Sequence, residues 1–130
     1  MLTEQQDKKR HAILGFPYPA KMIGGTASFR GIDSLQVKML IAEGFMDPEE
    51  TQNNSPTAKE LLELMEKHLG YYANGYMVDR ERSDCRVTLE AIGVRAEQNL
   101  PPSTVFEFLE LCKHADDLST EEKHLYAWWD

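Results

Sequence analysis

The chain has 130 residues, enough for one domain with a single hydrophobic core, and its 42% hydrophobic and 28% charged residues argue against wholesale disorder. No apolar run approaches the roughly 20 residues of a membrane-spanning helix, and the N-terminus lacks the pattern of a secretory signal. The net charge of −8 disfavours general nucleic-acid binding, because an acidic surface repels phosphates. We therefore expect a single domain, 1–130, in a cytoplasmic protein that binds neither membranes nor nucleic acid.

The charge is unevenly distributed along the chain. Residues 1–40 carry six Lys or Arg against three Asp or Glu, whereas residues 41–130 carry eight against nineteen, so the two parts have net charges of +3 and −11. An acidic surface of this kind either keeps a domain soluble or contacts a basic protein partner. The two cysteines, Cys85 and Cys112, fall at positions predicted to be buried, which is typical of reduced thiols in the cytoplasm.

The N-terminal quarter is predicted to have little regular structure. Residues 1–10 are polar and are expected to be frayed or loosely helical. Residues 11–32 combine apolar side chains with frequent prolines and glycines, which interrupt helices and strands. We expect this segment to wrap irregularly over the core, with one short strand at most. Its Gly24-Gly25-Thr26 run lacks the spacing of a phosphate-binding loop.

Three amphipathic helices are predicted, at 34–43, 56–69 and 104–115. Asp33 is a suitable N-cap for the first of them. Its buried stripe is expected to contain Leu35, Met39 and Ala42, with Ile32, Leu40 and Phe45 nearby. Polar residues that can act as N-caps also precede the other two helices: Ser55, or alternatively Thr57, for the second, and Ser103 or Thr104 for the third.

The segment Tyr71–Ile92 has the strongest strand signal, because β-favouring residues alternate on both sides of a charged, turn-forming cluster. We predict an antiparallel hairpin with strands 72–79 and 85–92. Gly75 is interpreted as a bulge or a close backbone approach, and the alternative is a two-residue turn at Asn74-Gly75. Alternation on the second strand places one set of side chains toward the core and another toward solvent: Cys85, Val87, Leu89 and Ala91 inside, and Arg86, Thr88 and Glu90 outside.

The aromatic C-terminus predicts a further strand, 124–129, at the edge of the sheet. Alternation would place Leu125, Ala127 and Trp129 on one face and Tyr126 and Trp128 on the other. The predicted fold class is therefore α+β, with a small antiparallel sheet of about three strands packed against the three helices.

The C-terminal aromatic side chains suggest a non-enzymatic protein-interaction domain. Adjacent tryptophans on a strand point to opposite faces, so one ring is hard to bury unless both faces are covered. A half-exposed indole is a good interface anchor, and an exposed edge strand invites self-association. The candidate interaction residues are Tyr126, Trp128 and Trp129, and the candidate partners are another protein or a second copy of the chain.

The alternative interpretation is a small enzyme or ligand-binding protein with an aromatic-lined pocket between sheet and helices. The candidate pocket residues are His68, Tyr72, Tyr76 and Arg86. No catalytic residue, cofactor or metal is predicted. The acidic loop 47–54 lacks calcium-loop spacing, the histidines lack the paired spacing of zinc ligands, and both thiols are expected to be buried and unreactive.

Overall fold

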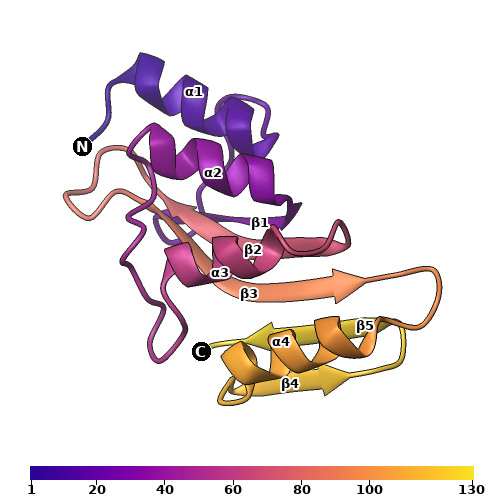
Figure 1. The fold of residues 1–130 in the computed structure, drawn as a ribbon. Coiled ribbons are helices and arrows are strands. Elements are labelled where there is room, and N and C mark those ends of the chain that lie inside the picture. The colour runs from indigo at the N-terminus through magenta and orange to yellow at the C-terminus, as the bar shows by residue number, and fades with distance from the viewer.

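The computed structural model describes residues 1–130 as four helices and five strands (Figure 1). In chain order they are α1 (Glu4–Leu14), β1 (Thr26–Ile32), α2 (Ser34–Ala42), α3 (Ala58–Met65), β2 (Tyr71–Val78), β3 (Val87–Arg95), α4 (Pro102–Cys112), β4 (Asp117–Thr120) and β5 (His124–Trp128). The strands form one antiparallel sheet in the order β1-β2-β3-β5-β4. The α+β class is confirmed, but the predicted numbers of strands and helices are both too small. None of the helices has the length and apolar character that crossing a membrane requires.

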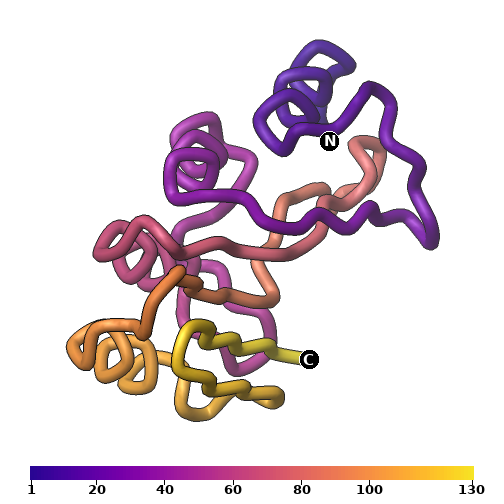
Figure 2. The backbone as a smooth tube through the Cα atoms, turned by 90° about the vertical axis from the view of Figure 1, so that its right-hand side faces the viewer, coloured from indigo at the N-terminus to yellow at the C-terminus, as the bar shows by residue number.

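The helices cover one face of the sheet. In Figure 2, α2, α3 and α4 lie together on one side of the strands, and α1 packs next to α2. We call the opposite face, which no helix covers, the open face (Figure 1 and Figure 2). The covered face supplies the sheet's share of the hydrophobic core: Ala27, Phe29, Ile32, Tyr71, Ala73, Met77, Val87, Leu89, Ile92, Val94, Leu125 and Ala127.

The N-terminal segment is more regular than its sequence suggests. Residues 4–14 form a regular helix, so of the two alternatives for residues 1–10 the helical one is correct. The segment predicted to be an irregular wrap contains the seven-residue strand β1. A capping box starts α1: the Thr3 hydroxyl accepts from the Gln6 amide at 3.1 Å, and the Gln6 side chain accepts from the Thr3 amide at 2.9 Å. The buried side of α1 includes charged residues, so apolar periodicity does not identify this helix.

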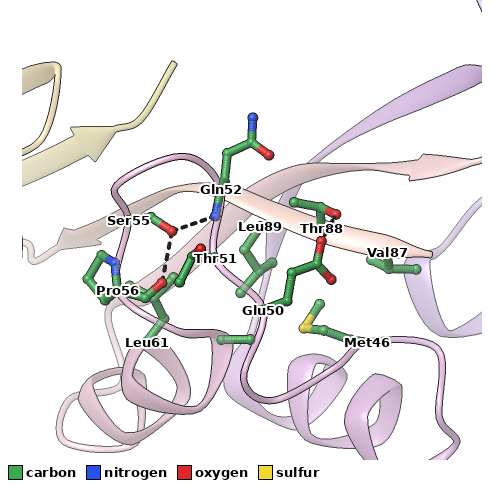
Figure 3. Close-up of a pocket in the computed structure, with 11 residues that line it drawn as sticks. Met46, Glu50, Thr51, Gln52, Ser55, Pro56, Leu61, Val87, Thr88 and Leu89 are labelled. Carbon is green, nitrogen blue, oxygen red and sulfur yellow. Dashed lines mark hydrogen bonds between the residues drawn. The ribbon is translucent and has the colours of Figure 1, made fainter. Parts of the chain in front are cut away.

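The N-caps of the other helices follow the sequence only in part. Asp33 caps α2 as predicted, with a capping box to Gln36. Thr57, the alternative, caps α3, because the Ser55 hydroxyl is used inside the loop, where it accepts from Gln52 N and donates to Pro56 O (Figure 3). Helix α4 begins at Pro102, ahead of both predicted caps, and has no side-chain cap.

The predicted buried stripe of α2 is confirmed only in part. Ile32, Leu40 and Phe45 are buried as predicted, whereas Leu35 and Met39 are 63% and 42% exposed, and the fully buried Val37 was not predicted. Five of the nine residues of this helix are large and apolar, so periodicity alone does not decide which side faces the sheet.

The central hairpin is confirmed. Strand β2 lies one residue earlier than predicted, whereas β3 begins two residues later and ends three residues later than predicted. A register shift at Asn74/Gly75 leaves Glu90 as an extra residue on β3. Gly75 is required at this point, because a Cβ there would collide with the Thr88 carbonyl oxygen and lie 2.9 Å from Phe29 Cζ. Both residues of the alternative Asn74-Gly75 turn lie within β2.

The extra residue corrects the predicted faces of β3. Val87 and Leu89 point to the core as expected, but the bulge moves Ala91 to the open face, where it pairs with Asn74 and Trp128. Cys85 and Arg86 precede β3 and belong to the turn.

The C-terminal strand is confirmed as β5, and its two faces are the predicted ones. Leu125, Ala127 and Trp129 are buried in the core, whereas Tyr126 and Trp128 are only half-buried. However, β5 is not an edge strand, because β3 pairs with one side of it and β4 with the other. The edge that would allow self-association through β5 is therefore occupied.

Candidate functional site

The two sets of candidate residues meet on the open face. Register with β3 places Tyr126 and Trp128 on the same side of the sheet as Tyr72 and Tyr76. Trp129 lies on the other side, is 1% exposed and belongs to the core. The open face therefore unites two of the three predicted interaction residues, Tyr126 and Trp128, with two of the four predicted pocket residues, Tyr72 and Tyr76.

His68 lies apart from this group. It follows α3, and its Nδ1 accepts a hydrogen bond from the Gly70 amide at 2.9 Å. Its ring packs edge-on against Tyr71, with ring centroids 6.4 Å apart, and burial raises the pKa of that tyrosine. These contacts give His68 a structural role at the start of β2.

Arg86 and Tyr76 hold the loop between α2 and α3 against the sheet. Arg86 Nε donates to Glu50 Oε1 at 2.9 Å and its Nη2 donates to the Tyr76 hydroxyl at 3.3 Å. The Tyr76 hydroxyl donates to Gln52 Oε1 at 3.1 Å. The Thr88 hydroxyl donates to the same Glu50 oxygen at 2.8 Å. The polar groups of these residues are thus already satisfied by the protein.

The pocket next to this network, between the loop, α3 and β3, is small. Figure 3 shows Met46, Leu61 and Val87 among the residues around it. Its volume of about 10 Å³ is enough for one water molecule at most. A metabolite does not fit between sheet and helices at this point.

A larger hollow lies on the open face and has a volume of about 670 Å³. Tyr72 contacts two of the other lining residues: its hydroxyl lies 2.7 Å from His124 Nε2, and the Arg95 guanidinium stacks 4.8 Å from its ring centroid. Two arginines and a histidine thus meet in a chain of net charge −8. The lining residues are Arg30, Gly31, Tyr72, Asn74, Arg95, His124 and Tyr126.

A groove between α3 and α4 has the opposite charge. Its volume is about 340 Å³, and it is lined by Glu60, Glu63, Leu64, Lys67, Phe106, Glu107, Glu110 and Leu111. Lys67 forms an ion pair with Glu107 at 2.8 Å, so one of the four glutamates is directly neutralised. The Phe106 side chain is 65% exposed although it is one of the largest apolar side chains in the chain. The groove therefore combines an exposed aromatic ring with excess negative charge.

The sequence pointed to neither site as a whole. The glutamates of the groove are spaced by three residues within each helix, which indicates an acidic row on α3 and another on α4. Periodicity cannot show that the two rows face one another. Arg30 and Arg95 are 65 positions apart in the chain, and only the strand order brings them to one hollow.

The structure offers few candidate side chains for catalysis or metal binding. No group of three or more His, Cys, Asp or Glu side chains is placed to hold a metal ion. Both cysteines are free thiols; Cys85 is half-buried and Cys112 is fully buried. Burial raises the pKa of Cys112 to about 12, so this thiol stays protonated at neutral pH.

The two thiols are expected to differ in reactivity. Iodoacetamide at pH 8 should alkylate Cys85 in the folded protein and leave Cys112 unmodified until the protein is unfolded in urea, because the protonated, buried thiol is a poor nucleophile. Peptide mass spectrometry of samples taken over time measures both sites. Labelling of Cys112 as fast as Cys85 would contradict the buried placement.

Comparison of the chain with known protein families, with curated proteins and with solved structures finds no match, so function must be argued from the geometry of these two sites.

Proposed function

We propose that the protein is a non-enzymatic protein-interaction domain that binds a basic, partly apolar helical segment of another protein in the groove between α3 and α4. The observation that carries the proposal is the exposed Phe106 ring among four glutamates. An apolar side chain of the partner would cover this ring while its lysines or arginines meet the carboxylates. The acidic excess after residue 40 adds long-range attraction for such a partner.

The groove is built on a rigid base. Helix α3 is held by the Thr57–Glu60 capping box and packs Leu61, Leu64 and Met65 into the core. Helix α4 is anchored by Phe108 and Cys112, both fully buried. The groove side chains are therefore presented by two fixed helices, which lowers the entropy lost on binding.

The charge balance selects a basic partner. Four glutamates and one lysine line the groove, which leaves an excess of three negative charges. Glu63 forms no ion pair. Glu110 forms only a long one, with 4.0 Å between its carboxylate and Lys113 at the helix surface. A partner segment with several lysines or arginines spaced along one helix would supply the missing counter-charges.

Charge reversal in the groove tests this proposal. The probe is a synthetic amphipathic peptide with lysine-rich and leucine-containing faces, titrated into the full chain and followed by amide chemical shifts and fluorescence anisotropy. We expect saturable binding with shifts in α3 and α4, weakening with added salt. The double variant Glu63→Lys/Glu110→Lys should bind at least about tenfold more weakly.

The controls separate the groove from general acidity. Glu97→Lys/Glu121→Lys changes the net charge equally at exposed positions outside the groove and should leave the affinity nearly unchanged. Phe106→Ala should weaken binding without changing the charge. Equal losses for the two double variants, or shifts spread over the whole acidic surface, would overturn the proposal.

A further inference from the structure

We infer that the hollow on the open face is a binding site for a small phosphomonoester, with Arg30 and Arg95 as the anion-binding groups. This inference is independent of the α3–α4 groove, which lies on the helical side of the molecule. It depends on three features of the hollow: an excess of hydrogen-bond donors, cations without counter-charges, and a geometry that is held in place before any ligand arrives.

The hollow is lined by donors and contains no carboxylate. Among its seven lining residues are two arginines, one histidine, one asparagine and two tyrosines. Asn74 Oδ1 accepts from the Gly31 amide at 2.9 Å, so the amide NH₂ of Asn74 remains free to donate. A lining made of N–H and O–H groups favours an anion with several acceptor oxygens.

The two arginines have no counter-ion in the protein. Arg10, Arg82 and Arg86 each form an ion pair with a carboxylate, whereas Arg30 and Arg95 form none. Glu90 feels the charge of Arg30 but does not line the hollow, and its pKa is raised because burial outweighs that attraction. The hollow thus carries two guanidinium charges that no ion pair neutralises, within an acidic molecule, as an anion site requires.

The side chains are held in place by one another. The Arg95 guanidinium lies over the Tyr72 ring, and its Nε is 3.4 Å from His124 Nε2. The Tyr72 hydroxyl is 2.7 Å from the same nitrogen, so the two side chains meet at one atom of His124. Stacking and hydrogen bonding fix the plane of the guanidinium, which matters for bidentate phosphate binding.

Gly93 makes this arrangement fit on the sheet. It pairs with Tyr72 on one side and Tyr126 on the other, and a Cβ at this position would collide with the Tyr72 ring. Glycine therefore allows the tyrosine to lie across β3 toward His124 and Arg95. The local sequence of β3 is adapted to the hollow and not only to the core.

The ligand class follows from charge and size. Two guanidinium groups suit the oxygens of a phosphate, and the volume of about 670 Å³ leaves room for an organic group beside it. The two tyrosines offer contacts that free phosphate cannot use. A long nucleic acid is disfavoured, since the net charge of −8 repels a polyanion.

Titration calorimetry of the full chain with AMP, inorganic phosphate and adenosine tests the inference and separates the two sources of phosphate. We expect saturable binding of AMP, weaker binding of phosphate and none of adenosine. Phosphate binding as tightly as AMP, or adenosine binding as well as AMP, would overturn the assignment to a phosphomonoester. A single-stranded oligonucleotide that binds far more tightly than AMP would overturn the assignment to a small ligand.

Substitutions locate the site. Arg30→Gln and Arg95→Gln should each weaken AMP binding by about tenfold or more, because each removes charge-assisted hydrogen bonds. Both side chains are at the surface, so folding should be intact by circular dichroism. Gly93→Ala should also weaken binding by displacing Tyr72.

Arg80→Gln is the matched control, since Arg80 also has no carboxylate partner and lies outside the hollow. It should bind AMP with the affinity of the unmodified protein. Equal weakening by Arg80→Gln and Arg95→Gln would mean that net charge, and not the hollow, governs binding.

Discussion

Replacing Arg10 with methionine is expected to lower the free energy of unfolding by about 3–5 kcal/mol, although arginine is usually a surface residue. Arg10 is 0% exposed. Its Nη2 and Nε donate to Asp7 Oδ1 at 2.7 and 3.1 Å, and its Nη1 donates to the Val78 carbonyl oxygen at 2.8 Å. The guanidinium joins α1 to the end of the central hairpin. Its removal leaves the buried Asp7 carboxylate with only the His11 ring beside it, whose Nδ1 is 3.3 Å from Asp7 Oδ1.

Urea unfolding followed by tryptophan fluorescence measures this effect. The matched control is Lys9→Met, at the preceding position of α1. It removes an exposed ion pair with Glu43 and should lower the free energy of unfolding by at most about 1 kcal/mol. The variant Asp7→Asn should also be strongly destabilised. The double variant Asp7→Asn/Arg10→Met should lose less free energy of unfolding than the sum of the two single losses, because the two charges depend on one another. An Arg10→Met protein as stable as Lys9→Met would show that the buried pair contributes little.

The same residues explain why α1 could not be predicted from apolar periodicity. Its buried residues include Asp7, Arg10 and His11, which a hydrophobicity pattern assigns to solvent. The Thr3–Gln6 capping box is present in the sequence, but a capping signal without an apolar stripe after it does not predict a stable helix. A buried charge network is stabilised by long-range partners, here Val78 and Arg86, and a local window does not contain them.

Elements with an apolar face were predictable within the limits of local periodicity. The hairpin, the N-cap at Asp33 and both faces of β5 follow from residues that lie close together in the sequence. The alternation fails at Glu90, because one extra residue moves Ala91 to the open face and lets Ile92 continue the core. The sequence predicts a bulge or a close backbone approach at Gly75. It does not show that the extra residue lies on the facing strand, β3.

The candidate sites, too, were predictable only where residues close together in the sequence determine them. The sequence predicts Tyr72 as a pocket residue and Tyr126 and Trp128 as interaction residues, and the structure places all three on the open face. Arg30 and Arg95 were not selected, since each is an ordinary charged residue in its own segment. Their joint position depends on β1 pairing with β2 and on β3 pairing with β5, which the sequence does not reveal.

The neighbouring tryptophans give the second large expected effect. Trp129→Ala should lower the free energy of unfolding by about 3–5 kcal/mol, whereas Trp128→Ala should cost about 1 kcal/mol or less. Trp129 is 1% exposed, belongs to the hydrophobic core and donates its backbone amide to the Glu90 carbonyl oxygen at 3.0 Å. Trp128 is half-buried on the open face, so its removal leaves no enclosed cavity.

Two single-tryptophan proteins separate the environments of the two rings without large destabilisation. Trp128→Phe retains the core indole and should emit at shorter wavelength and resist acrylamide quenching, whereas Trp129→Phe retains the open-face indole and should be quenched readily. Urea unfolding of the two alanine variants gives the stability difference directly. Equal destabilisation and equal quenching would place both indoles in similar surroundings, which strand alternation across β5 and the uncovered open face do not allow. The accessible Trp128 indole also serves as an intrinsic fluorescence reporter of any ligand that covers the open face. This signal is independent of the α3–α4 groove, which lies on the other side of the molecule.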